Sequence, residues 1–257
     1  MNDENIKRQV QKTFSKSKES YVTSKTHNNR KDLDMITVWL QPKSSWTVLD
    51  IATGGGHVAR QLSLDAELVF ATDLTKEMLA NTASHLHSYS NIHYVVADAE
   101  QLPFIDESFD AVTCRIAPHH FPNPGHFIHE VHRVLKKDGR FVMIDNIAPE
   151  DTELDSFYNS FEKMRDSSHH RAWKVSEWKK LLKEYGLRIE KEIDRKKTLP
   201  FYEWASRTLE EKEIHQVETY FLNSSTRLKS YFQIKTHSER VTEFTIDEWM
   251  VLSSKPL

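Results

Sequence analysis

Short runs of β-branched and aromatic residues alternate with helical segments, and this alternation restricts the possible folds more than any other feature. The strand-like runs are residues 47–52, 67–73, 92–98, 109–115 and 139–147. The segments between them with helical patterns are residues 56–64, 75–88 and 124–136. Apolar strands separated by helices form parallel sheets that are covered on both faces. The sequence therefore predicts an α/β fold with a Rossmann-like, mostly parallel sheet and helices on both faces.

The first predicted strand ends in a glycine-rich turn. The stretch VLDIATGGGHVA spans residues 48–59 and contains three of the six glycines in the 257-residue chain. Glycine permits a tight turn and a close approach to a ligand, and a helix N-terminus offers free N–H groups. Because one glycine suffices for a plain strand-to-helix turn, three in succession predict a ligand at the carboxyl end of this strand.

Three acidic residues indicate which ligand this is. The glycine spacing also fits a dinucleotide pattern, but Asp50, four residues before Gly54, would repel a pyrophosphate and suits a ligand with an ammonium group. Asp73 ends the second strand and can accept hydrogen bonds from both ribose hydroxyls. Asp98 ends the third strand, where it can accept from an adenine amino group. Ribose, adenine and a cationic amino-acid tail together describe S-adenosylmethionine.

The same stretches resemble the successive motifs of class I S-adenosylmethionine-dependent methyltransferases. The matching segments are VLDIATGGGHVA, ATDLTKEML, ADAEQLPFIDESFDAVTCRIAPHHF and EVHRVLKKDGRFVMIDNIAPED. The chain is most similar to the subgroup of ubiquinone/menaquinone-biosynthesis C-methyltransferases, and DSFYNSFEKMRDSSHHRAWKVSEW resembles uncharacterised bacterial members of it. The resemblance implies S-adenosylmethionine as cofactor, S-adenosylhomocysteine as product, and a seven-stranded sheet whose last strand is antiparallel.

The resemblance also implies which residues contact the cofactor. Asp50 is expected to orient the methionine amino group, Asp73 to hold the ribose and Asp98 to face the adenine. The family usually has glycine where this chain has Ala52, and the alanine predicts an ordinary negative φ at that position. The expected cofactor-binding residues are Asp50, Ile51, Ala52, Thr53, Gly54, Gly56, Asp73, Leu74, Met78, Asp98, Ala99, Glu100, Arg115, Ile116 and Ala117.

The catalytic residues are expected at the ends of the fourth and fifth strands. Methyl transfer from a sulfonium needs mainly positioning, with a base only where the acceptor loses a proton. His119 and His120 follow the fourth strand, and histidine titrates near neutral pH. We prefer His120, because the matching family position is usually histidine. Asn146, at the end of the fifth strand, completes the predicted catalytic set.

Four further residues are predicted to lie near the substrate. They are Tyr21, in the N-terminal helical region, and Arg165, His169 and Trp173, in RDSSHHRAW. Each has a structural alternative, as a packing residue, a cap or a member of a surface salt bridge. The methyl acceptor is expected to be a small molecule, aromatic or isoprenoid by analogy with the family.

The chain is predicted to form a single domain over residues 1–257. Its expected parts are an N-terminal helical cap at 1–42, a cofactor-binding core at 43–147, a helical lid insertion on the substrate side at 148–235, and a closing antiparallel strand at 236–257.

Composition excludes several function classes. The net charge is −3 and no basic stripe is present, so a nucleic-acid partner is not expected. No apolar run is long enough to span a membrane, and the polar N-terminus favours a cytoplasmic location. Cys114, the single cysteine, cannot form an internal disulfide. His126, His129 and His132 lie on one predicted helix away from the expected site, so no metal is predicted.

Two other functions stay open on the sequence. A protein with this site can bind S-adenosylmethionine as a sensor or assembly partner without transferring the methyl group. The alternative enzyme is an NAD(P)-dependent reductase, in which YVTSK, residues 21–25, would supply a tyrosine–lysine pair. In the reductases that use such a pair it follows the glycine loop, whereas here it precedes the loop.

Overall fold

The structure is a computed structural model that describes residues 2–23 and 30–257, without the side chains of residues 16–23. Two helices begin the chain, α1 (Asp3–Thr23) and α2 (Arg30–Leu40). The alternating region contains β1 (Thr47–Ile51), α3 (His57–Leu62), β2 (Leu68–Asp73), α4 (Lys76–His85), β3 (Ile92–Val96), β4 (Phe109–Arg115), the 3₁₀ helix η1 (Pro118–His120), α5 (Pro124–Val134) and β5 (Leu135–Ile147). The last part contains α6 (Thr152–Arg165), α7 (Val175–Glu184), β6 (Arg188–Pro200), α8 (Phe201–Ala205), α9 (Glu211–Leu222), α10 (Thr226–Tyr231), β7 (Lys235–His237) and β8 (Arg240–Ser254).

The strands form one mixed sheet in the order β3-β2-β1-β4-β5-β8-β6, with β7 paired to β8. The strands from β3 to β5 are paired in parallel, whereas β8 runs antiparallel to both β5 and β6. The predicted α/β fold and antiparallel last strand are therefore confirmed. The short β7 forms a hairpin with β8 and adds an eighth strand to the seven that the resemblance implies.

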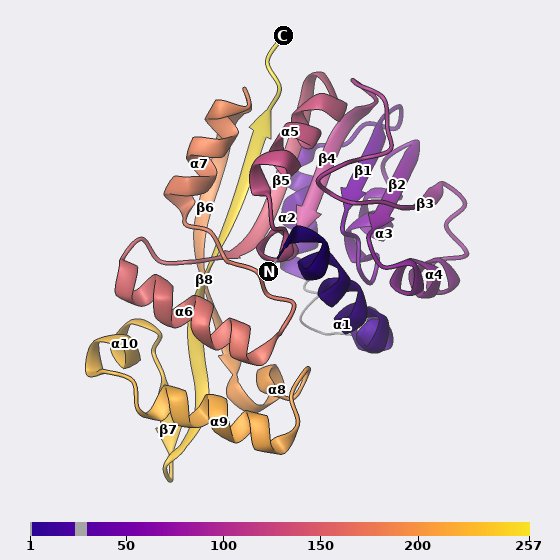
Figure 1. Ribbon diagram of the computed structural model, residues 1–257. Helices are drawn as coiled ribbons and strands as arrows, with labels where there is room; N and C mark the ends of the chain where they lie inside the picture. The colour runs from indigo at the N-terminus through magenta and orange to yellow at the C-terminus, as the bar shows by residue number, and fades with distance from the viewer. Residues whose placement is uncertain (1, 24–29) are drawn as a thin grey trace.

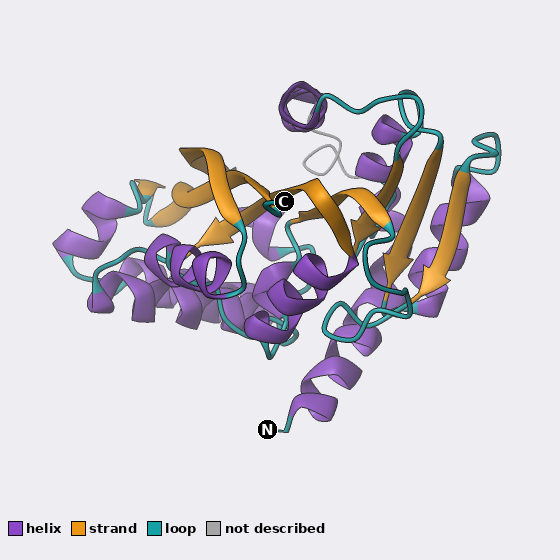
Figure 2. Ribbon diagram, turned by 90° about the horizontal axis from the view of Figure 1, so that it is seen from above, coloured by secondary structure: helices purple, strands orange, loops and turns teal. Residues whose placement is uncertain are grey.

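Helices cover both faces of the parallel strands (Figure 2). Successive side chains of a strand point to opposite faces, so one strand contributes to two apolar clusters. In β1, Leu49 and Ile51 join the cluster that contains residues of α5 and α7, whereas Val48 joins the cluster that contains residues of α2 and α3. Burial on both faces explains why these strands have continuous apolar runs in the sequence.

Two strands extend past the parallel part of the sheet. β8 pairs with β5 only from Asp247 onward, whereas its pairing with β6 already includes Glu243. A third apolar cluster covers this extension, with Leu199 of β6, Phe244 of β8 and residues of α6, α8, α9 and α10. Figure 1 shows these helices gathered around the extended ends of β6 and β8. Residues 148–235, predicted as a helical insertion, thus also contain the edge strand β6.

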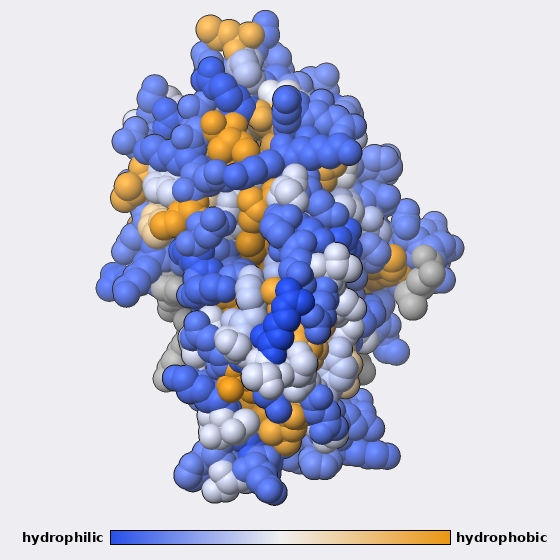
Figure 3. All heavy atoms as spheres, turned by 90° about the vertical axis from the view of Figure 1, so that its left-hand side faces the viewer, coloured by the Kyte–Doolittle hydropathy of each residue, from blue (hydrophilic) through white to orange (hydrophobic). Residues whose placement is uncertain are grey.

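The outer face beside α6 and α7 is mostly hydrophilic, with apolar atoms in small separate groups (Figure 3). None of the described helices is both long and apolar enough to cross a membrane.

Candidate functional site

A first cavity, with an open volume of about 1000 Å³, lies at the carboxyl ends of β1, β2 and β4. Open α/β sheets bind ligands at this edge, because the loops there diverge and expose backbone groups. Most of the residues predicted to contact the cofactor line this cavity, although Ile51 and Gly56 do not. Those that line it are Asp50, Ala52, Thr53, Gly54, Asp73, Leu74, Met78, Asp98, Ala99, Glu100, Arg115, Ile116 and Ala117.

The glycines of the first loop have different structural roles. Gly54 has φ +50°, and a Cβ atom there would meet nothing within 4 Å, so this part of the loop leaves room beside the cavity that it lines. Gly56 has φ +74°, and a Cβ atom there would lie 2.5 Å from the side chain of Thr82 in α4. Gly54 therefore leaves space for a ligand, whereas Gly56 is required for the turn and for packing against α4.

The prediction of a negative φ at Ala52 is wrong. Ala52 has φ +53°, in the left-handed region that the family's usual glycine adopts without strain. The loop is held in this shape by backbone hydrogen bonds, including Thr53 N to Thr72 O at 2.8 Å. An alanine in this conformation costs about 1–2 kcal/mol, because its Cβ approaches the following carbonyl.

Ala52→Gly is therefore expected to stabilise the protein. Relief of the strain, offset by the greater freedom of glycine in the unfolded chain, predicts a gain of about 0.5–1 kcal/mol in the free energy of unfolding, measured by urea denaturation. The matched control is Ala59→Gly in α3, where the same substitution is expected to destabilise a buried helix by about 1 kcal/mol or more. A loss of stability in Ala52→Gly as large as in Ala59→Gly would contradict the argument.

Asp50 is a buried carboxylate that lines the first cavity. Its two oxygens accept hydrogen bonds from Thr53 Oγ1 at 2.6 Å and Thr113 Oγ1 at 2.7 Å. Burial raises the pKa of Asp50 to about 6, against the opposing effect of these hydrogen bonds and of the Arg115 charge. The ionised form of a buried acid of this kind is stabilised by a ligand that carries a positive charge.

Asp73 connects the ends of two strands. Its Oδ2 accepts from Gly54 N at 3.1 Å and its Oδ1 accepts from Thr75 N at 2.8 Å. Burial raises its pKa, although these hydrogen bonds favour the charged form. The side chain thus fixes the glycine loop while it lines the cavity.

Helix α1 covers the cavity, which the sequence analysis did not predict in detail. Lys7, Val10 and Phe14 line it, and their spacing of three and four residues places them on one face of the helix. Lys7 Nζ lies 2.6 Å from both Asp98 Oδ2 and Glu100 Oε2. The amphipathic spacing in α1 was the available indication, but only the fold shows that this face meets Asp98.

A second cavity, with an open volume of about 550 Å³, adjoins the first and shares Ile116 and His120 with it. Ile116 has φ +54°, a strained conformation for a β-branched residue, and such strain concentrates at functional sites. Residues in or just after η1, β5, α6, β6 and α8 complete the lining: His119, Asn146, Glu162, Arg165, Asp166, Lys197, Leu199, Trp204 and Arg207.

Three histidines meet beside this cavity. His119 Nδ1 lies 2.7 Å from Asp145 Oδ1, and Asp145 Oδ2 also accepts from the backbone N–H of His119. The ring of His120 lies 4.2 Å from that of His119, and His120 Nδ1 lies 3.0 Å from the Ser168 carbonyl oxygen. His169 lies 5.5 Å from His119, ring to ring, and its Nε2 contacts Asn159 Oδ1 at 2.9 Å.

The neighbours of these histidines give them different protonation behaviour. Burial lowers the pKa of His119, but the charge and hydrogen bond of Asp145 raise it above its ordinary value. Burial and the charge of His119 lower the pKa of His120 to about 3. Burial and the neighbouring histidines also lower the pKa of His169. At neutral pH His120 and His169 are therefore neutral, and His119 is the histidine able to exchange a proton.

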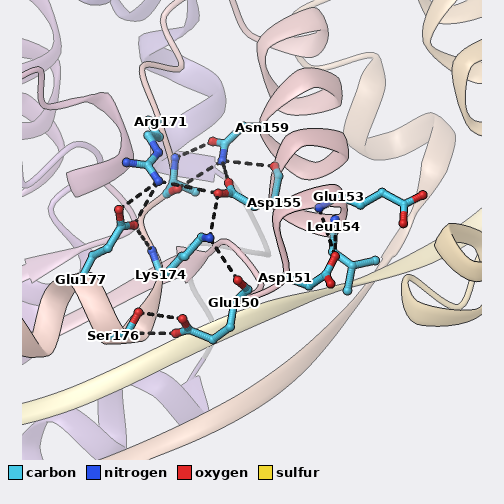
Figure 4. A network of polar contacts seen from close by, with 11 residues as sticks. Glu150, Asp151, Glu153, Leu154, Asp155, Asn159, Arg171, Lys174, Ser176 and Glu177 are labelled. Atoms are coloured by element: carbon cyan, nitrogen blue, oxygen red, sulfur yellow. Dashed lines mark hydrogen bonds and ion pairs between the residues drawn. The ribbon is translucent and has the colours of Figure 1, made fainter.

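A polar network holds the segment between α6 and α7 that carries Ser168 and His169 (Figure 4). Arg171 Nη2 donates to Glu177 Oε1 at 3.0 Å, and Lys174 Nζ lies 3.3 Å from Asp155 Oδ2. Asn159 Oδ1 accepts from the backbone N–H of Ala172 at 2.7 Å. These contacts anchor the segment to both helices and so keep it against His119 and His120.

The other predicted residues have different positions. His119, Asn146 and Arg165 line the second cavity, and His120 lines both. His169 and Trp173 line neither, although His169 packs on His119 and Trp173 stacks under the Arg171 guanidinium at 4.5 Å. The side chain of Tyr21 lies outside the described residues.

The residues that β6, α8 and the turn after α8 bring to the second cavity were not predicted from the sequence. Lys197 and Leu199 are two residues apart on β6 and share a face, and Trp204 and Arg207 follow in or just after α8. This alternation was visible in the sequence, but nothing in it indicated that the edge strand lies beside η1.

Comparisons with known proteins support the same cofactor chemistry. The model of a family described as a methyltransferase domain matches residues 49–143. YcgJ of Bacillus subtilis, named an uncharacterized methyltransferase, is 40% identical over 167 residues, which cover 64% of this chain and 66% of YcgJ. The crystal structure of YcgJ aligns with a TM-score of 0.86 and 30% identity, over 89% of this chain and 100% of that one.

Two further relatives agree. The crystal structure of a candidate methyltransferase from Bacillus halodurans has a TM-score of 0.86 and 40% identity, over 88% of this chain and all of that one. The ubiquinone/menaquinone biosynthesis C-methyltransferase UbiE of Rickettsia typhi is 31% identical over 129 residues, 47% of this chain and 52% of UbiE. In sequence the chain thus matches about two thirds of the length of YcgJ and about half of UbiE.

Proposed function

The chain belongs to the class I S-adenosylmethionine-dependent methyltransferases, with S-adenosylmethionine as its cofactor, and from this membership we propose that it methylates a proton-bearing atom of a small molecule. The observation that carries the proposal is the His119–Asp145 pair, because His119 lines a second cavity that adjoins the cofactor cavity. The acceptor is proposed to bind in that second cavity.

The residues of the first cavity fit this cofactor. Asp50 suits the ammonium group, Asp73 the ribose hydroxyls and Asp98 the adenine amino group, while Leu74 and Met78 offer apolar contact. The space beside Gly54 allows the ligand to approach the backbone. When bound, S-adenosylmethionine supplies an activated methyl group on a sulfonium.

The raised pKa of Asp50 predicts that cofactor affinity depends on pH. Below a pKa of about 6 the free protein holds Asp50 protonated, whereas the ammonium group of a ligand favours its ionised form. Binding therefore releases a proton, and affinity for S-adenosylhomocysteine is expected to fall by up to about tenfold per pH unit below pH 6. Calorimetric titrations at several pH values measure this slope. The Asp50→Asn variant should bind more weakly and lose the slope; a variant that keeps the slope would contradict the assignment.

His119 is proposed as the general base. Its Nδ1–H donates to Asp145, so Nε2 is left as the proton acceptor. Asp145 fixes this tautomer and stabilises the imidazolium formed when Nε2 takes the proton that the acceptor atom loses on methylation. This assignment differs from the preference for His120, because the pKa of His120, at about 3, makes it a poor base at neutral pH.

His120 and Asn146 are proposed to position the reacting groups. His120 lies between the two cavities, and its ring is nearly perpendicular to that of Phe14 of α1, with the ring centroids 5.1 Å apart. Among the described residues, Asn146 Oδ1 finds no hydrogen-bond donor although it is buried. A hydroxyl or N–H group of the acceptor would satisfy it, which supports an acceptor that carries a proton at the methylated atom.

Transfer of a labelled methyl group tests the proposal. The protein is incubated with methyl-labelled S-adenosylmethionine and a bacterial cell extract that has been separated into small molecules and macromolecules. We expect label in the small-molecule fraction with the wild type and a strong loss with His119→Gln. Label in protein or nucleic acid, or no transfer by a protein that binds S-adenosylhomocysteine, would overturn the proposed function.

A further inference from the structure

The second cavity contains charged groups that the proposed proton transfer does not use. Two cations, Lys197 of β6 and Arg207 just after α8, line it together with the apolar side chains of Leu199 and Trp204. The base and Asn146 come from other elements, η1 and β5. The cavity therefore has His119 and Asn146 on one side, and apolar and cationic side chains together on the side of β6 and α8.

The acidic residues of the cavity already have partners within the protein. Glu162 Oε2 accepts from Arg165 Nε at 3.1 Å and Nη2 at 2.9 Å. Asp166 Oδ1 accepts from both the backbone N–H and the hydroxyl of Ser168, at 2.8 and 2.5 Å. Both carboxylates are almost fully buried. They are thus occupied in fixing α6 and the segment after it, and a cationic acceptor would have to displace these contacts.

Lys197, in contrast, stands at the end of a chain of ion pairs. Lys197 Nζ lies 3.5 Å from Glu248 Oε2, whereas the other oxygen of Glu248 lies 2.7 Å from Arg195 Nη2. Arg195 Nη1 in turn lies 2.7 Å from Asp32, which also pairs with Arg115 at 2.9 Å.

This series of ion pairs contains three cations and two anions. Lys197, at one end, lines the second cavity, and Arg115, at the other end, lines the first. Each carboxylate is shared between two cations, so Glu248 only partly neutralises Lys197. Charges in such a partly buried setting are stabilised by a further partner of opposite sign. At the second cavity an anionic ligand can supply such a partner for Lys197, and Glu162 and Asp166 already accept hydrogen bonds from other groups.

We infer that the acceptor is a small organic acid, with a carboxylate or phosphate bound by Lys197 and Arg207, an apolar body against Leu199 and Trp204, and a proton-bearing atom toward Asn146 and His119. The inference rests on the proposed function and specifies its substrate class. Carboxylate and phosphate oxygens both form charge-assisted hydrogen bonds to lysine and arginine, so the shared chemistry is an anionic oxygen group.

Binding of four simple probes to the protein saturated with S-adenosylhomocysteine tests the charge requirement. The probes are benzoate, phenyl phosphate, neutral benzamide and cationic benzylamine, and ligand-observed NMR measures their dissociation constants. Benzoate or phenyl phosphate is expected to bind at least about tenfold more tightly than benzamide and benzylamine. Tighter binding of benzoate would identify the anionic group of the acceptor as a carboxylate, and tighter binding of phenyl phosphate would identify it as a phosphate. Equal or tighter binding of benzamide or benzylamine would overturn the inference, as would failure of both anions to bind.

Variants of two neighbouring lysines test whether Lys197 binds the anionic group of the probe. Lys197→Met is expected to weaken the anionic probe at least about tenfold and to leave benzamide unchanged. The matched control is Lys196→Met, because Lys196 lies on the other face of β6 and pairs with Asp247 at 2.5 Å. An equal loss of affinity for the anionic probe in both variants, or no loss in Lys197→Met, would contradict the assignment of Lys197 to the anionic group.

The binding of S-adenosylhomocysteine to the same samples distinguishes a wrong acceptor class from a wrong proposed function. If it binds and the anionic probes do not, the acceptor class is wrong and the cofactor assignment stands. If it does not bind, the proposed function itself fails.

Discussion

Asp73→Ala is expected to weaken the binding of S-adenosylhomocysteine about a hundredfold while the protein stays folded. The carboxylate is proposed to accept two ribose hydroxyls, and a hydrogen bond to a charged group contributes about 1.5–3 kcal/mol. It also holds Gly54 N and Thr75 N, so its loss frees the loop that surrounds the ligand. Together these losses correspond to about 3 kcal/mol, or a hundredfold in the dissociation constant. Calorimetric titration measures the affinity, and the far-UV circular dichroism melt reports the fold.

Asp110→Ala is the matched control for this variant. Asp110 is also an aspartate on a central strand, and it accepts from Thr47 N at 2.9 Å and from Lys136 Nζ at 2.9 Å. It does not line the first cavity. We expect Asp110→Ala to lower stability with little change in affinity. Wild-type affinity in Asp73→Ala, or an equal loss in both variants, would show that Asp73 does not hold the ribose.

His119→Ala is expected to reduce kcat by about 10²–10⁴, the usual contribution of a general base, with unchanged affinity for S-adenosylhomocysteine. His126→Ala, on the exposed side of α5, is the control and should keep full activity. The acceptor found by the labelling experiment serves as substrate. A kcat in His119→Ala within a few-fold of the wild type would rule out the base assignment.

The pH profile separates a base from a packing residue. Asp145 raises the pKa of His119 above its ordinary value, and only the neutral imidazole accepts a proton. Activity should therefore rise with pH through an apparent pKa above about 6.5. Asp145→Asn removes the charge, so the apparent pKa should move down and kcat should fall. Because the two residues act as a unit, His119→Ala/Asp145→Asn should lose little more than His119→Ala alone.

The central part of the fold could be predicted from the sequence because its physical causes are local. The central strands β1 and β4 are buried on both faces, which requires continuous apolar runs, and parallel strands joined by helices leave few possible topologies. Asp50, Asp73 and Asp98 follow or end such strands, so the sheet itself brings them together. Each of them lines the first cavity.

The features that the sequence did not indicate depend on contacts between distant segments. The covering of the cavity by α1 depends on Lys7 meeting Asp98, 91 residues away. The second cavity forms where residues of β6 and α8 lie near η1, and β6 comes late in the chain and lies at the edge of the sheet. The positive φ of Ala52 was missed for a different reason: the loop hydrogen bonds override the preference of alanine.

Calorimetric titration with S-adenosylhomocysteine, with NADH as the parallel ligand, tests the central claim most directly. We expect one-to-one binding of S-adenosylhomocysteine, weaker below pH 6, and no binding of NADH. Binding of NADH in its place would contradict the account, because a pyrophosphate would then lie beside the carboxylate of Asp50.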